Sequence, residues 1–136
     1  MSAAAGSTEP SKDRRAELAD LTDRFVDAFN RRGLADVMSF FAADAVYEDA
    51  FGDKHEGKAA ISAALAPVVD GGLGEICFEG EDRFIDPAAG KVMDSWRLHM
   101  HRGEGAEKER TLRGLDLLHF EGRELVRKVT YKQDGS

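Results

Sequence analysis

The sequence has little of what builds a disulfide scaffold, a metal centre or a membrane span. Its 136 residues include one cysteine, Cys77, so an internal disulfide and a cysteine-based zinc site are both excluded. The apolar runs are short, well below the roughly 20 residues that a membrane helix needs. The opening MSAAAGSTEP lacks the basic start and apolar middle of a secretion signal. These absences predict a cytoplasmic protein with no membrane partner.

Acidic residues outnumber basic ones, which argues against a nucleic-acid partner. The chain has 26 Asp and Glu against 19 Lys and Arg, for a net charge of -7, so it has no overall attraction for phosphate backbones. Apolar residues make up 42% of the chain, enough for one ordinary core. We therefore expect a disordered N-terminus over residues 1–10 and a single domain over residues 11–136.

Helical and strand-like patterns occupy different halves of the chain. Apolar spacing predicts a long amphipathic helix over residues 11–32 and shorter helices over 34–44 and 58–69. Strand-like segments follow at residues 75–86, 91–101, 108–120 and 124–133, joined by turn-forming DPAAG, RGEGAE and EGRE. This order predicts an α+β domain in which the helices pack on one face of a strongly curved antiparallel sheet.

Two aspartates fall on strand faces that are otherwise apolar. If AVYEDAF is a strand, alternation places Asp49 on one face with Tyr47 and Phe51. In the segment TLRGLDLLHF, Asp116 shares a face with Leu118. A buried carboxylate is costly unless it is paired, hydrogen-bonded or neutral. Either residue alone can be a structural aspartate bonded to a turn, or simply exposed. Together, in one dry pocket, two carboxylates would have their pKa values pushed apart.

The neighbouring strand KVMDSWRLHMH supplies more of this inner face. Asp94, Trp96, Leu98 and Met100 alternate onto one side of it. Both faces of the strand around Asp116 are largely apolar, so we expect the helices to cover one face and a partner subunit or neighbouring strand to cover the other.

The histidines offer a weaker alternative. His99 and His101 share one strand face, and His119 lies on the corresponding set of the next strand, so a surface metal site is geometrically possible. A recognised ligand spacing is lacking. We expect no metal, and we expect these side chains to meet water or a dimer contact on the outer sheet face.

From Arg24 to Tyr131 the chain resembles the nuclear-transport-factor-2-like superfamily, which includes ketosteroid isomerases and SnoaL-like polyketide cyclases. The resemblance rests on RFVDAFNRRGLADVMSFFAADAVYEDAFG, on GKAAI, on the tryptophan strand and on RGLDLLHFEGREL. It implies a cone, in which a curved, mostly antiparallel sheet wraps around a long helix and leaves a deep apolar pocket. It also implies a homodimer through the outer sheet face and no cofactor.

The resemblance further implies residue roles. Asp49, in the E-D pair of YEDAFG, corresponds to the catalytic base, and Asp116 in LDLLHFEG corresponds to a protonated aspartate that donates to the substrate oxyanion. The expected reaction is proton transfer next to the carbonyl of a small hydrophobic substrate, as in an isomerase or cyclase. The expected pocket walls are Phe25, Phe41, Tyr47, Phe51, Trp96, Leu98, Met100 and Leu118.

Two alternatives remain open. Phe25 stands where the isomerases carry a tyrosine that donates to the oxyanion, which favours a non-catalytic module that binds an apolar ligand or dimerises. The superfamily also contains epoxide hydrolases with an Asp-Arg-Asp relay. Alternation places Arg97 and Arg113 on the face opposite the aspartates, so this reading requires one of them to reach Asp116.

Overall fold

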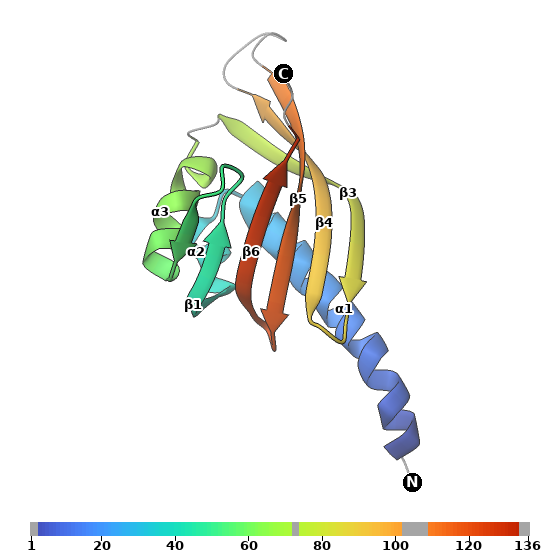
Figure 1. Ribbon diagram of the computed structural model, residues 1–136. Coiled ribbons are helices and arrows are strands. Elements are labelled where there is room, and N and C mark those ends of the chain that lie inside the picture. Colours follow the sequence, from blue (N-terminus) through green and yellow to red (C-terminus); the bar gives the residue numbers. More distant parts are fainter. Residues whose placement is uncertain (1–2, 72–73, 102–108, 134–136) are drawn as a thin grey trace.

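The computed structural model describes residues 3–71, 74–101 and 109–133, with side chains from residue 12 (Figure 1). The helices are α1 (Ala3–Asn30), α2 (Leu34–Ser39) and α3 (Lys58–Val69). The strands are β1 (Phe41–Glu48), β2 (Lys54–Glu56), β3 (Glu75–Asp86), β4 (Lys91–His101), β5 (Glu109–Glu121) and β6 (Glu124–Lys132). None of the helices in the described ranges combines the length and hydrophobicity needed to cross a membrane.

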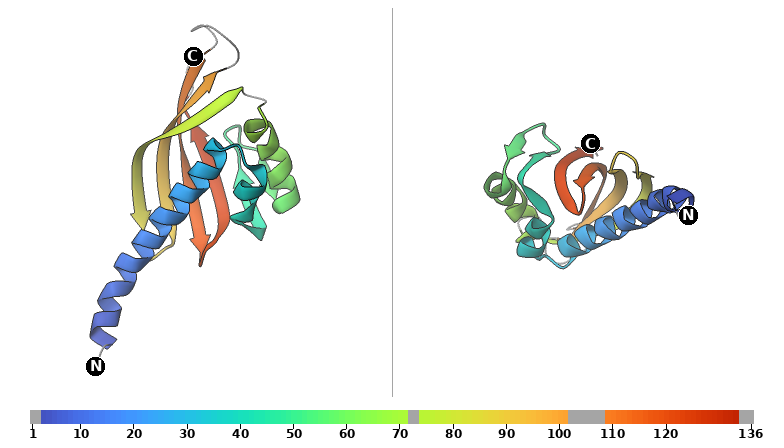
Figure 2. Two further views of the ribbon diagram at one scale, coloured as in Figure 1. Left: turned by 180° about the vertical axis from the view of Figure 1, so that it is seen from behind. Right: turned by 90° about the horizontal axis from the view of Figure 1, so that it is seen from below.

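One curved sheet carries all six strands, in the order β2-β1-β6-β5-β4-β3. Strands β3 to β6 pair as antiparallel neighbours, as the turn sequences predict. The parallel pairing of β1 with β6 and the short strand β2 are not foreseen from the sequence. Helix α1 lies across the concave side of the sheet, with α2 and α3 beside β1 (Figure 2). The expected α+β architecture is confirmed.

Two helix boundaries differ from expectation. The first helix was predicted over residues 11–32, whereas α1 spans Ala3–Asn30, because alanines extend an existing helix at little cost. The second helix ends at Ser39 instead of residue 44, and β1 begins at Phe41. The amide of Leu125 in β6 donates to the carbonyl of Phe40, so pairing with β6 overrides the helical preference of the following alanines.

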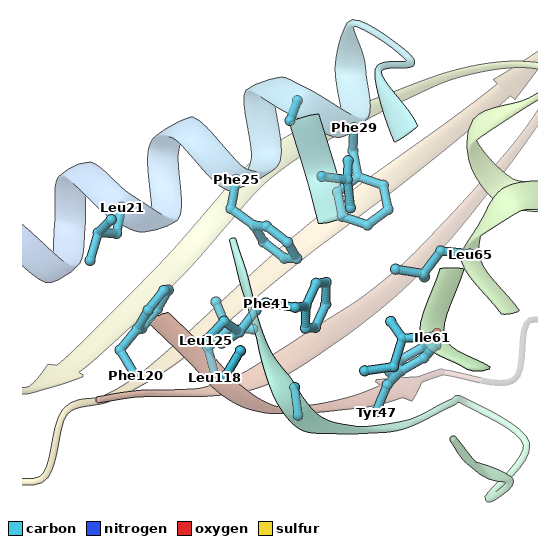
Figure 3. Packing of buried hydrophobic residues seen from close by; sticks show 14 of the residues in the cluster. Leu21, Phe25, Phe29, Phe41, Tyr47, Ile61, Leu65, Leu118, Phe120 and Leu125 are labelled. Carbon is cyan, nitrogen blue, oxygen red and sulfur yellow. The ribbon is translucent and has the colours of Figure 1, made fainter. Parts of the chain in front are cut away.

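The apolar stripe of α1 forms the centre of the core. Phe25 packs edge-to-face against Phe29, Phe40 and Phe41, with ring centroids 5.2 to 5.7 Å apart. Figure 3 shows Phe25, Phe29 and Phe41 pointing into the same interior as Leu65 of α3 and side chains of the sheet. Side chains therefore fill the space between this part of α1 and the sheet.

Candidate functional site

Two carboxyl groups face each other on the concave side of the sheet. Asp94 in β4 and Asp116 in β5 are direct partners in the strand register, so their side chains lie on the same face. Asp94 is only 4% exposed. The alternation expected for β4 is confirmed, since Trp96, Leu98 and Met100 are buried on the same side.

Asp116 accepts hydrogen bonds from three side chains. The Trp96 indole Nε1 donates to Oδ2 over 3.1 Å, and Lys128 Nζ donates to Oδ1 over 3.0 Å. The Thr130 hydroxyl also donates to Oδ1. Both carboxyl oxygens of Asp116 are therefore already engaged by side chains of the sheet.

Lys128 is itself buried, with 5% of its surface exposed. Its ammonium lies 4.5 Å from the centre of the Tyr47 ring and 2.7 Å from the Thr130 hydroxyl. A buried ammonium needs a counter-charge, and Asp116 supplies it. The two residues therefore form an ion pair inside the cone.

Asp94 has a different cation, Arg83 of β3. Arg83 Nε donates to Asp94 Oδ1 over 2.8 Å, and Nη1 donates to Asp23 Oδ1 of α1 over 2.8 Å. A β-bulge between Gly80 and Asp82 places two residues of β3 opposite one residue of β4. Because side chains alternate along a strand, the extra residue turns Arg83 toward the inner face.

Burial raises the pKa of Asp94 above its ordinary value, although the hydrogen bond and charge of Arg83 oppose the shift. The negative charges of Asp116 and Asp23 add to the rise. A carboxyl group with a raised pKa beside a second carboxyl group in a cleft is typical of acid-base sites. The pair expected from the sequence was Asp49 with Asp116, whereas the pair that faces across the strands is Asp94 with Asp116.

A cleft of about 260 Å³ opens beside Asp94 between α1 and the β3–β4 edge. Among the described residues no hydrogen-bond donor contacts Asp94 Oδ2. In the same residues, every side-chain nitrogen or oxygen that is sealed from solvent has a hydrogen-bond partner, so Oδ2 is not sealed from solvent. Oδ2 is thus reachable from the cleft. The lining residues are Asp23, Val26, Asp27, Asn30, Gly80, Arg83, Asp94 and Trp96.

Asp49 lies in the turn after β1. Its Oδ1 accepts from the amides of Phe51 and Asp53 over 2.9 and 3.0 Å, and its Oδ2 lies 2.9 Å from His55 Nε2. Burial acts to raise the pKa of Asp49, but the His55 hydrogen bond and the two amides outweigh it and hold that pKa below its ordinary value. This geometry matches the alternative in which the aspartate is hydrogen-bonded to a turn.

The prediction that Phe51 shares a strand face with Tyr47 and Asp49 is wrong. Phe51 is 79% exposed, because β1 ends at Glu48 and Phe51 lies in the turn beyond it, where strand alternation no longer applies. Phe51 is not a pocket wall.

Asp49 and Asp116 have separate partners. The connection between them is indirect, since the His55 ring stacks on Tyr47, whose other neighbour is Lys128. Of the remaining expected pocket walls, Phe25, Phe41 and Leu118 belong to the main core, while Trp96, Leu98 and Met100 form a second buried cluster. Trp96 is the expected wall that lines the cleft of Asp94.

The polar residues of the outer face form their own pairs. Arg97 and Arg113 both bind Glu81, so neither reaches Asp116 as the epoxide hydrolase alternative requires. His99 contacts Glu79, and His101 lies 3.5 Å from Glu109. Within the described ranges no group of three or more His, Cys, Asp or Glu side chains could hold a metal ion.

Four residues of this site were given no role by the sequence. Asp94 was placed on the inner face but given no role. Arg83 could be found only through the bulge, for which Gly80 inside a strand is a signal. Lys128 and Thr130 alternate onto one face of β6, and two polar residues on one face are typical of a strand face exposed to solvent. The sequence carries no signal of their burial.

The comparisons with known proteins agree with this fold. No match was found among curated proteins. An NTF2-like protein of unknown function from Mesorhizobium loti superposes with a TM-score of 0.72 at 21% identity, covering 89% of this chain and 94% of that one. A proposed polyketide cyclase from Xanthomonas campestris pv. campestris gives 0.76 at 17% identity, covering 88% and 93%.

A third structure is a hypothetical protein with a ketosteroid isomerase-like fold from Catenulispora acidiphila, in complex with trimethylamine. It gives a TM-score of 0.69 at 20% identity, covering 82% of this chain and 83% of that one. At these identities the structures show a shared fold and no more. Residues 22–128 match the SnoaL-like domain, and the chain therefore belongs to the SnoaL-like domain family.

Proposed function

We propose that this protein binds a small carbonyl compound in the cleft beside Asp94 and moves a proton next to the carbonyl group, as an isomerase or cyclase does. The observation that carries the proposal is the facing pair of carboxyl groups, the buried Asp94 and the half-buried Asp116. One has a raised pKa and a reachable oxygen, and the other is held by three donors.

In this mechanism Asp94 is the base. Its Oδ2 takes the proton from the carbon next to the carbonyl, and the electron pair moves onto the carbonyl oxygen to form an enolate. In an isomerisation the proton then returns from Asp94 to another carbon and the carbonyl re-forms. In a cyclisation the enolate carbon attacks a second carbonyl, and the alkoxide formed there takes the proton from Asp94. A base with a raised pKa is matched to such a transfer near neutral pH.

Arg83 is placed to stabilise the enolate oxygen. Its Nε and Nη1 are engaged by Asp94, Asp23 and the Ala19 carbonyl, while Nη2 has no hydrogen-bond partner among the described residues. A guanidinium directed at a developing oxyanion lowers the barrier in a water-poor site. The charge of Asp116 contributes to the raised pKa of Asp94 and so strengthens Asp94 as a base.

Binding without chemistry is the second candidate. Phe25 occupies the position of the family's tyrosine donor and is packed against three other phenylalanine rings. Phe25 itself offers no hydroxyl, and its ring is surrounded by other side chains. A protein that only holds an apolar ligand needs neither a donor there nor a base with a raised pKa.

Deuterium exchange tests the proposal without knowledge of the natural substrate. The wild type, Asp94→Asn and Asp49→Asn are incubated with cyclohexanone and 2-tetralone in D₂O, and the loss of the hydrogens next to the carbonyl is followed by NMR. We expect the wild type to accelerate exchange, Asp94→Asn to lose about a hundredfold or more, and Asp49→Asn to stay near the wild type.

Other results would overturn the assignment in distinct ways. Loss of exchange in Asp49→Asn alone would identify Asp49, in the turn after β1, as the catalytic base. Binding of a phenol that mimics the enolate, with no exchange in the wild type, would favour the binding protein.

We also propose that two copies associate through the outer sheet face. Leu117 and Tyr131 are 42% and 55% exposed there, beside a mainly apolar hollow of about 410 Å³. The hollow is ringed by both signs of charge, namely Glu48, Asp86, Lys91 and Arg127. A patch with balanced charges can pair with its own copy across a two-fold axis, despite the net charge of -7.

A further inference from the structure

We propose that Asp23 on α1 is a positioning residue, which holds the Arg83 guanidinium against Asp94 and thereby sets the pH at which Asp94 gains its proton. The inference rests on the proposed function in one respect, namely that Asp94 is used in catalysis. The contact itself stands on geometry.

Asp23 joins the helix to the sheet at this point. Its Oδ1 accepts from Arg83 Nη1 over 2.8 Å, across 60 residues of sequence. The flanking acidic residues of α1 pair within the helix instead, Asp20 with Arg24 and Asp27 with Arg31. Asp23 thus differs from its neighbours in binding an arginine that also contacts the buried carboxyl group.

Two carboxylates fix the orientation of one planar guanidinium. Arg83 uses Nε on Asp94 and Nη1 on Asp23, and its weaker contact with the Ala19 carbonyl spans 3.4 Å. The Arg83 side chain is partly exposed, at 27%. Without Asp23 it would keep a single charged partner and gain freedom to turn toward solvent, away from Asp94.

The charged groups around Asp94 come from every element packed on it. Arg83 faces it from β3, Asp116 from β5, and Asp23 from α1, while Asp27 lines the same cleft. Lys128 of β6 stands behind Asp116. Asp23 therefore acts on the pKa of Asp94 in two opposite ways. By holding Arg83 in place it lowers that pKa, and through its own negative charge it raises that pKa.

These two effects predict opposite shifts. Burial is the main cause of the raised pKa of Asp94, the Arg83 hydrogen bond is the strongest opposing cause, and the charge of Asp23 is the smallest contribution. If Asp23 acts by holding Arg83, its removal raises the pKa of Asp94 further. If Asp23 acts only as a charge, its removal lowers that pKa.

NMR titration of the Asp94 carboxyl carbon in the full chain separates the two. We expect Asp23→Ala to raise the titration midpoint by about one unit, at the lower end of the one to three units that a whole charged partner is worth. Asp23→Asn keeps an oxygen for Nη1 and should rise less. Asp20→Ala, which removes a carboxylate paired within the same helix, should leave the midpoint unchanged.

A midpoint that falls or stays in place in Asp23→Ala would overturn the inference. Asp23 is an exposed helix position, so the variant should fold, and Asp23→Asn gives a second reading if it does not. Ketone exchange should shift its pH profile by the same amount. If no variant catalyses exchange, the proposed function fails while the NMR midpoint still decides the role of Asp23.

Discussion

The indole nitrogen of Trp96 donates a hydrogen bond to Oδ2 of Asp116 across the β4–β5 pair, over 3.1 Å. The indole can lie there because its register partner on β5, Gly114, has no side chain. A Cβ at Gly114 would collide with the Trp96 ring and with the Tyr131 carbonyl. The hydrogen bond from Trp96 to Asp116 therefore depends on a glycine two residues away from that aspartate.

Trp96→Phe should destabilise the protein by about 1.5–3 kcal/mol, because it removes a hydrogen bond to a charged group while keeping most of the apolar surface. Urea unfolding followed by circular dichroism measures the change, since the variant has no tryptophan. The same substitution made in Asp116→Asn should cost less, because the acceptor there is neutral. An equal cost in both backgrounds would show that the loss comes from packing alone.

Gly114→Ala should cost about 1–3 kcal/mol, in the range of other overpacked interiors, because the new methyl group would meet the Trp96 ring and backbone that cannot yield. Gly80→Ala is the matched control, since a Cβ there meets nothing within 4 Å. Thermal and urea unfolding of both variants measure the difference. Similar stabilities for the two would contradict the close approach of Trp96.

Lys128→Met should destabilise the fold by about 3–5 kcal/mol, because it leaves the Asp116 charge without its partner inside the cone. The double variant Lys128→Met, Asp116→Leu removes both charges and should recover much of that loss. Urea unfolding of the wild type, both single variants and the double variant gives the coupling energy. Strictly additive costs would mean that the two groups do not interact.

Asp49 should contribute a stability that acid removes. Its folded pKa lies below the ordinary value, so the unfolded chain takes up the proton first as pH falls. The stabilisation is fully present above the ordinary pKa of about 3.9 and is lost as pH falls through the lower, folded pKa. We expect the stability advantage over Asp49→Asn to shrink between pH 5 and pH 3, as measured by urea unfolding.

Asp44→Asn serves as the control for this pH dependence, because Asp44 lies on the same strand but is exposed. Its stability difference from the wild type should change little over the same range. An advantage of Asp49 that stayed constant or grew toward pH 3 would contradict the hydrogen bonds of the turn.

Local pattern accounts for most of the architecture. Alternation in β4 and β5 placed Asp94, Trp96 and Asp116 on the concave face, and the structure confirms all three. Turn sequences gave the antiparallel order of the last four strands. These features depend on residues near one another in the sequence, which explains why they could be predicted.

The features that were not predicted depend on pairing between segments that are distant in the sequence. The bulge in β3 reverses alternation and brings Arg83 inward, and the parallel pairing of β1 with β6 sets where β1 begins and ends. Lys128 is buried only because Asp116, twelve residues earlier, neutralises it. Alternation within one strand carries no information about a counter-charge on another strand, so the ion pair could not be predicted.

Leu117→Glu should separate the proposed dimer into monomers. Leu117 lies on the outer face, lines the apolar hollow and is 42% exposed, so a carboxylate there would be desolvated and placed near its own copy across a two-fold axis. Sedimentation velocity at several concentrations should give twice the monomer mass for the wild type and the monomer mass for Leu117→Glu. Ala59→Glu adds the same charge at an exposed position of α3 and should remain dimeric. A wild type that sediments as a monomer, or an unchanged mass in Leu117→Glu, would remove the outer face from consideration as the contact between copies.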